Sequence, residues 1–232
     1  YYAKLKDLER GIEREYEGMT TVMLTLTASN ENANGGPRCP ADHMRDIMDG
    51  YDAARKQLHK AMSGRNWEYA RVWEPHESGY GHLHIAVFVE GDPARDELTP
   101  GTFESVMRSH VENCDPAGWD AHRPDGNAVS MNRDVNNLGT YISEYIGIFG
   151  EEALDRPVTE QMFYATCWAT NTRRLDFGQN AQEIISGEQF RRETGLRPSD
   201  RGDCESDSKA ADGDDSDVGD DDDSGWSVRH RC

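Results

Sequence analysis

The stretch Gly79-Tyr80-Gly81-His82-Leu83-His84-Ile85-Ala86-Val87-Phe88-Val89 predicts a β-strand that follows directly on a glycine-containing turn. Side chains alternate along a strand, so His82 and His84 share one face, while Leu83 and Ile85 share the other. Two imidazoles side by side on an accessible face are a potential pair of metal ligands. The pair alone is weakly specific, because the same spacing occurs on ordinary solvated strands. The flanking sequence must therefore supply the rest of any site.

Hydrophobic patterning on both sides of this strand predicts alternating helices and strands. Residues 20–28 alternate apolar and polar side chains as a half-buried strand does, and residues 67–74 are expected to form a hairpin with residues 82–90. Apolar side chains at helical spacing indicate helices that pack on a core. In chain order, we predict a helix at 3–17, a strand at 20–28, a helix at 44–62, strands at 67–74 and 82–90, a helix at 99–113, a strand at 127–131 and a helix at 135–149.

After the first helix, this order is β-α-β-β-α-β followed by a helix, which is typical of an α+β fold of the ferredoxin-like or RRM-like kind. In such a fold the first and third strands are central neighbours in an antiparallel sheet, with the helices on one face. We therefore expect Thr25 and Thr27 of the first strand to lie beside His82 and His84 on the open face.

The chain is strongly acidic, with 44 Asp and Glu against 25 Lys and Arg and a net charge of −19 over 232 residues. Such a balance ordinarily argues against nucleic-acid binding. It also suits a cytoplasm at molar salt, where a Debye length of about 3 Å screens the repulsion from DNA. The alternative is an ordinary acidic protein with an acidic tail.

Composition divides the chain into a helix at 1–18, a folded domain at 19–197 and a tail at 198–232. The tail is rich in Ser, Gly and Asp, so we expect it to be disordered. The sequence contains no membrane-spanning stretch and no signal peptide, and it starts at Tyr1, which suggests a fragment. Five scattered cysteines without a Cys-x-x-Cys pair favour a cytoplasmic location.

Glu74 is the first candidate for a third ligand, since it ends the strand that pairs with the His82 strand. Two imidazoles and a carboxylate suit Mn²⁺ or Mg²⁺, and Zn²⁺ is also compatible. Strict alternation places Glu74 on the same face as Val72, which we expect to point into the core, so a bulge or strand end would have to rotate it outward. His76 and Glu77 in the following loop are the alternative ligands.

Tyr141 and Tyr145 are four residues apart and therefore share one face of the predicted 135–149 helix. In isolation this spacing is typical of a packed aromatic pair. Beside a metal it favours a nucleophile, because a phenol with a pKa near 10 attacks more readily when its phosphodiester target is polarised.

Together these motifs resemble a rolling-circle replication initiator of the HUH endonuclease superfamily. Thr25-Leu26-Thr27 resembles its first motif, His82-Leu83-His84 its second, and Tyr141 with Tyr145 its tyrosine motif, in the right order. Residues 168–174 resemble a region downstream of the tyrosine in archaeal plasmid and viral initiators, and the resemblance covers roughly residues 20–180. With the acidic composition, it points to a haloarchaeal plasmid or virus.

The resemblance implies an HUH endonuclease domain with a C-terminal extension at 19–197 that nicks and rejoins single-stranded DNA at a replication origin. It implies a 5′-phosphotyrosine intermediate, a Mn²⁺ or Mg²⁺ cofactor, and a host DNA polymerase and helicase as partners. Residues 25, 27, 71 and 80 are candidates for DNA contact, and Arg71 and Tyr80 are equally well explained as ordinary strand and loop residues.

One departure concerns the Lys that this tyrosine motif usually carries three residues after a tyrosine. Glu144 and Ile148 stand there instead, and Arg133 is a candidate substitute. Either tyrosine remains possible as the nucleophile, with Tyr145 favoured for its place in the apolar stripe. The alternatives in function are a transposase or relaxase with the same chemistry, and a non-catalytic nucleic-acid-binding module.

Overall fold

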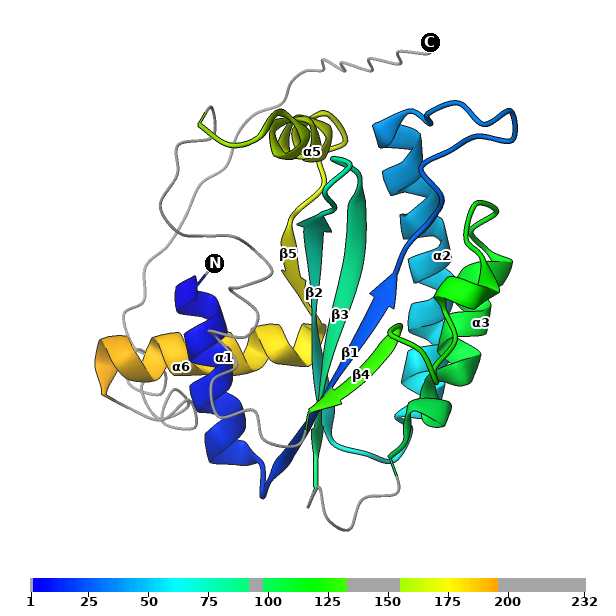
Figure 1. The fold of residues 1–232 in the computed structure, drawn as a ribbon. Helices are drawn as coiled ribbons and strands as arrows, with labels where there is room; N and C mark the ends of the chain where they lie inside the picture. The colour runs from blue at the N-terminus through cyan, green and yellow to red at the C-terminus, as the bar shows by residue number, and fades with distance from the viewer. Residues whose placement is uncertain (1, 92–97, 133–154, 196–232) are drawn as a thin grey trace, which may run out of the picture. The chain divides into compact units, whose positions relative to one another are not determined.

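The computed structural model describes residues 2–91, 98–132 and 155–195, which belong to one structural unit spanning Tyr1–Arg197 (Figure 1). The predicted helix at 135–149 with its two tyrosines, Arg133 and the acidic tail lie outside the described residues.

The sheet of this unit has five antiparallel strands in the order β4-β1-β3-β2-β5. The strands are β1 (Met19–Leu26), β2 (Trp67–Pro75), β3 (Gly81–Glu90), β4 (Val129–Asn132) and β5 (Leu175–Phe177). The α+β class and the central pairing of the first and third strands are thereby confirmed. The short strand β5 was not predicted, and it extends the sheet beyond β2.

The helices are α1 (Tyr2–Glu15), α2 (Pro40–Ala61), α3 (Glu104–Glu112), α5 (Val158–Ala169) and α6 (Gln179–Thr194), with 3₁₀ turns at Pro100–Phe103 and Trp119–Ala121. Helices α2 and α3 cover the first face of the sheet, as Figure 1 shows. The alternating side chains of β1 and β3 supply the core on this face, where Leu24 and Ile85 are fully buried. Proline at the first position of α2 fits a helix start, because its missing N–H has no partner there in any helix.

The second face of the sheet is partly covered, which corrects the expectation of an open face. Helices α1 and α6 lie on this side (Figure 1), and Leu5 and Leu8 of α1 form a second apolar cluster with Met23, Ala86 and Phe88 of the sheet. The physical reason is that α1 carries an apolar stripe beneath its many charges, and the stripe needs a surface to pack against.

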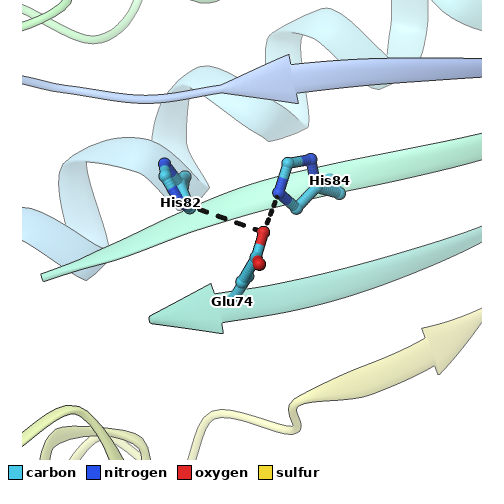
Figure 2. Close-up of side chains that lie close together, drawn as sticks. All are labelled: Glu74, His82 and His84. Atoms are coloured by element: carbon cyan, nitrogen blue, oxygen red, sulfur yellow. Dashed lines mark hydrogen bonds and ion pairs between the residues drawn. The ribbon is translucent and has the colours of Figure 1, made fainter. Parts of the chain in front are cut away.

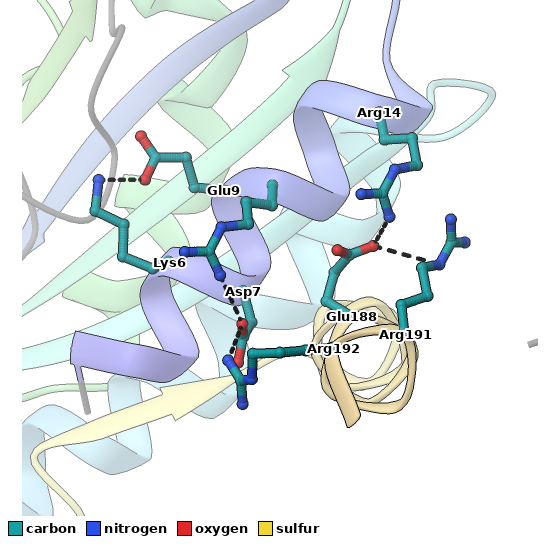
Figure 3. A network of polar contacts seen from close by, with 8 residues as sticks. Lys6, Asp7, Glu9, Arg14, Glu188, Arg191 and Arg192 are labelled. Carbon is teal, nitrogen blue, oxygen red and sulfur yellow. Dashed lines mark hydrogen bonds and ion pairs between the residues drawn. The ribbon is translucent and has the colours of Figure 1, made fainter. Parts of the chain in front are cut away.

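Two nearly buried carboxylates fasten α1 to α6 (Figure 3). Each of them pairs with one guanidinium from α1 and one from α6: Asp7 with Arg10 at 3.2 Å and Arg192 at 2.7 Å, and Glu188 with Arg14 and Arg191. Buried carboxylates need such partners, since an unpaired buried charge is costly. The helices also approach closely at Gly11, where a Cβ would lie 2.1 Å from Cγ2 of Ile184.

Two buried histidines hold the chain just after β1. The ring of His110 lies 4.8 Å from that of His122, and neither residue is exposed. Nε2 of His110 is 3.1 Å from the Thr27 carbonyl oxygen, and the Thr27 N–H donates to Nε2 of His122 at 3.1 Å. The N–H and the carbonyl group of Thr27, which lies just beyond the end of β1, therefore have hydrogen-bond partners in these histidines and not in a neighbouring strand.

Gly50→Ala is expected to destabilise the protein. A Cβ at this position in α2 would lie 2.4 Å from Nδ1 of His110 and 2.8 Å from Cβ of Cys114, so α3 would have to move away. Overpacking of this kind costs about 1–3 kcal/mol, measurable by denaturant unfolding. Gly118→Ala is the control, because its Cβ would meet nothing within 4 Å. Equal stability of the two variants would contradict the close packing of α2 and α3.

We expect stability to fall as the pH is lowered from about 6.5 to 4. Burial lowers the pKa of His110 to about 4, with a smaller contribution from His122. A histidine kept neutral in the folded state contributes stability above its unfolded pKa of about 6.5, and loses it as the unfolded chain takes up the proton. His110 alone accounts for about 3 kcal/mol across this range, and burial shifts the pKa of His43 and His122 in the same direction.

The measurement is the free energy of unfolding as a function of pH in wild type and in His110→Gln. The variant should show a shallower pH dependence, and His59→Ala, which removes an exposed histidine, should follow the wild type. A wild-type profile that stays flat down to pH 4.5 would refute this assignment.

Candidate metal centre

The β2–β3 hairpin brings the three predicted ligands together. Glu74 is paired directly with His82, and Val72 with His84, so the carboxylate and both imidazoles project from the same face. Oε2 of Glu74 lies 2.6 Å from Nε2 of His84 and 4.0 Å from Nε2 of His82 (Figure 2). One ligand atom from each of the three residues lies within 4.8 Å of the other two.

The expected bulge at Glu74 is not needed, because Val72 faces the second side of the sheet and not the main core. Val72 packs in the apolar cluster under α1 and α6, whereas Trp73 is the β2 side chain buried in the core under α2. Strict alternation therefore places Glu74 with the histidines. The error arose from assuming that only one face of the sheet is covered.

The electrostatics of the cluster suit metal binding at neutral pH. Burial lowers the pKa of His82 to about 4, and the neighbouring His84 lowers it further than Glu74 raises it. His82 is therefore a neutral imidazole at pH 7, the form that coordinates a cation. The side chains of Glu74 and His82 are 30% and 22% exposed, so the centre is accessible to solvent. Two nitrogens and a carboxylate leave further coordination positions for oxygen ligands.

Thr25 supports the cluster from behind. It is paired with His84 across β1 and β3, and its Oγ1 lies 3.1 Å from Nδ1 of that ring. A hydrogen bond to the far nitrogen fixes the orientation of a ligating histidine and keeps its Nε2 directed at the centre. The sequence analysis predicted that Thr25 contacts DNA and did not predict its hydrogen bond to His84. The predicted pairing of the first and third strands was the signal for that hydrogen bond.

A pocket of about 170 Å³ adjoins the cluster at His82. Thr27, His43, His76 and Tyr80 are among the side chains that line it. The Tyr80 hydroxyl donates to the Arg38 carbonyl oxygen at 2.6 Å, so this side chain is held at the pocket wall. Two of the predicted DNA contacts, Thr27 and Tyr80, thus line a space beside a candidate ligand.

Other candidates are not brought to the cluster. Arg71 lies on the opposite face of the sheet, where it contacts the ring of Tyr51 and pairs with Asp176 at 2.8 Å. The alternative ligands His76 and Glu77 are not members of the group of ligand atoms. The ring of His76 packs edge-on against that of His82, with 5.4 Å between the centroids, and its Nδ1 bonds to the Ser78 hydroxyl at 2.9 Å.

Helix α5 packs directly against the turn that joins β2 to β3. A Cβ at Gly79 would lie 2.8 Å from the Thr159 carbonyl oxygen, and the φ angle of 83° at Gly79 also favours glycine. A Cβ at Gly81 would lie 2.9 Å from the ring of Phe163, which is fully buried. The two glycines therefore permit the contact that fixes the hairpin end carrying the cluster.

The fold and this cluster define an α+β protein with a candidate metal centre on a central hairpin of its sheet. The chain belongs to the family described as "Putative rep protein (DUF1424)", whose sequence profile matches residues 1–217. No helix among the described residues is both long enough and apolar enough to cross a membrane.

Two relatives carry the name "Uncharacterized 36 kDa protein". The chain is 37% identical over 203 residues to the protein from Halobacterium salinarum and 35% identical over 209 residues to that from Halobacterium sp. (strain GN101). Each match covers 81% of this chain, but only 63% and 62% of the respective relative, so the chain spans less than two thirds of their length. No solved structure matches the chain. The relatives support the halophilic archaeal context predicted from the acidic composition.

Mn²⁺ is expected to bind the chain at this cluster, and His84→Ala should weaken binding more than tenfold because it removes one of three protein ligands. Thr25→Val should weaken binding by about 10- to 100-fold, since it deletes the hydrogen bond that orients His84. Isothermal titration calorimetry measures both effects, and His59→Ala on α2 is the control. Unchanged affinity in His84→Ala, or loss of binding in His76→Ala, would show that Mn²⁺ does not bind at the predicted cluster.

Proposed function

We propose that this chain is the nicking domain of an HUH-type replication initiator, which cuts single-stranded DNA at an origin and starts rolling-circle replication. The observation that carries the proposal is the group formed by Glu74, His82 and His84 on the central strands of the sheet. Membership of a family described as a rep protein supports the same conclusion, because replication initiation of this kind requires a site-specific nick.

In this proposal Glu74, His82 and His84 hold a divalent cation, with Mn²⁺ or Mg²⁺ favoured by the mixed donor set. The bound cation would supply Lewis-acid stabilisation of the negative charge that develops on the scissile phosphate. Thr25 keeps the His84 ring in its ligating orientation, and the pocket lined by Thr27 and Tyr80 receives the DNA next to the cation.

The proposed nucleophile is the phenol of Tyr145 or Tyr141. Its oxygen forms a bond to phosphorus while the bond from phosphorus to the 3′ oxygen breaks; the phenolic proton is given up to solvent or a nearby base, and the leaving 3′ oxygen takes up a proton from solvent. The products are a 5′-phosphotyrosine and a free 3′ hydroxyl, which a host polymerase extends while a host helicase unwinds the template. The reverse reaction reseals the strand, so no nucleotide triphosphate is consumed in joining.

The test uses single-stranded oligonucleotides that tile the DNA flanking the gene, incubated with the chain and Mn²⁺. The expected product is a denaturation-resistant protein–DNA adduct, which His84→Ala abolishes because it removes a ligand. Tyr145→Phe or Tyr141→Phe should abolish it as well, since phenylalanine lacks the attacking oxygen. Gel electrophoresis under denaturing conditions measures the adduct.

Tyr16→Phe is the matched control, because it removes a phenol whose hydroxyl is buried between α1 and the sheet. It should leave the adduct unchanged. DNA binding without any adduct in the presence of Mn²⁺ would favour the non-catalytic binding module, and an adduct that survives both tyrosine substitutions would exclude these nucleophiles.

A further inference from the structure

A cationic surface lies on the C-terminal half of α2, away from the metal centre. Residues 53–67 contain no Asp or Glu, in a chain that has 44 of them. This stretch carries Arg55, Lys56 and Lys60, and the last two are among only five lysines in the whole chain. The last carboxylate of α2 is Asp52, so residues 53–61 of the helix carry none.

These three cations take no part in the ion pairs found among the described residues. Most other arginines of the described segments are paired with a carboxylate, including exposed ones such as Arg45 with Asp42. Cations at a helix C-terminus favour the helix dipole, but that effect is confined to the last turn. It accounts for Lys60, whereas Arg55 and Lys56 lie one turn after Asp52 without forming an ion pair with it.

An aromatic pocket adjoins the cations. Trp67 and Tyr69 of β2 stack with 5.7 Å between ring centroids and an interplanar angle of 22°, and the exposed ring of His59 meets Trp67 edge-on at 5.0 Å. Arg55 and these three rings line a pocket of about 210 Å³. Nε of Arg55 is buried without a hydrogen-bond partner among the described residues.

One carboxylate, Glu68, lines the same pocket. It accepts hydrogen bonds from the Asn180 side chain and the Ala181 backbone at the start of α6, and burial raises its pKa to about 7. At neutral pH this carboxyl group is therefore partly protonated, and its charged form is hydrogen-bonded to α6.

The pocket is separate from the metal centre. Trp67 and Glu74 are seven residues apart on β2, which corresponds to about 23 Å at about 3.3 Å per residue. Trp67 and Tyr69 also project toward α2, whereas Glu74 projects from the opposite face. A ligand at this surface does not touch Glu74, His82 or His84.

We propose that Arg55, Lys56 and Lys60, with the Trp67–Tyr69 pocket, form a second binding surface for single-stranded DNA. Cations that form no ion pair, beside partly buried rings, are a combination that binds a strand without sequence preference, through phosphate contacts and base stacking. Stacking matters in a halophilic protein, because molar salt weakens phosphate contacts. The choice of DNA as the ligand rests on the proposed replication function, but binding here needs neither the metal nor the tyrosines.

The test compares two triple variants of the chain that remove the same charge. Arg55→Gln/Lys56→Gln/Lys60→Gln removes the proposed contacts, and Arg45→Gln/Arg108→Gln/Arg123→Gln removes three exposed arginines that are each paired with a carboxylate. Binding of a fluorescein-labelled oligothymidylate is followed by anisotropy over a range of KCl concentrations. EDTA is present throughout, so that a metal-dependent interaction does not contribute.

The first triple variant should bind roughly tenfold more weakly, with a salt dependence reduced by about 2 in log–log slope, at about 0.7 for each lost phosphate contact. The control variant should bind as the wild type does. Equal weakening of both variants would show an effect of net charge alone, and loss of all wild-type binding in EDTA would place the DNA only at the metal centre. Either result overturns the proposal.

Tryptophan fluorescence gives a second measurement that does not depend on the charge variants. Oligothymidylate should quench the wild-type emission, and Trp67→Phe should lose most of this quenching while keeping a ring in the pocket. Undiminished quenching in Trp67→Phe would exclude the aromatic pocket. Formation of the covalent adduct with Mn²⁺ is scored separately, so failure of nicking and failure of this surface are distinguishable.

Discussion

The backbone pairing between β2 and β3 is the constraint on which the candidate site depends. It sets Glu74 directly opposite His82, and it places all three ligand atoms on one face at the end of the hairpin. A shift of one residue would turn the carboxylate to the opposite face. The pairing of β1 with β3 adds Thr25 behind His84. The geometry of the site is thus determined mainly by the register of the paired strands, and less by the conformation of any loop.

The two covered faces of the sheet explain why register is so firmly specified. Apolar side chains of β2 enter both cores, with Trp73 under α2 and Val72 under α1 and α6. Slippage of the strand would exchange these two side chains between cores of different size. The paired carboxylates Asp7 and Glu188 hold α1 and α6 together, and so contribute indirectly to the geometry of the hairpin.

Much of this arrangement was accessible from the sequence, because alternation along β1 and β3 is clear and because the order of elements limits the topology. The face of Val72 was not accessible, since a strand buried on both sides has apolar residues at both parities and period two no longer identifies the core side. The three-residue strand β5 is too short to leave a pattern. The pairing of the first and third strands was predicted from the order of elements, but the register that sets Thr25 directly opposite His84 was not, because periodicity gives the face of a side chain and not its partner across the sheet.

The close packing of α5 against the β2–β3 turn limits which substitutions this part of the site can accept during evolution. Because Gly79 and Gly81 face backbone and a buried ring, neither position accepts a larger residue without displacing α5. Changes in what the adjoining pocket accepts are therefore expected to arise by substitutions along its wall, at positions such as Ser29 and Ser78, while the two glycines stay unchanged.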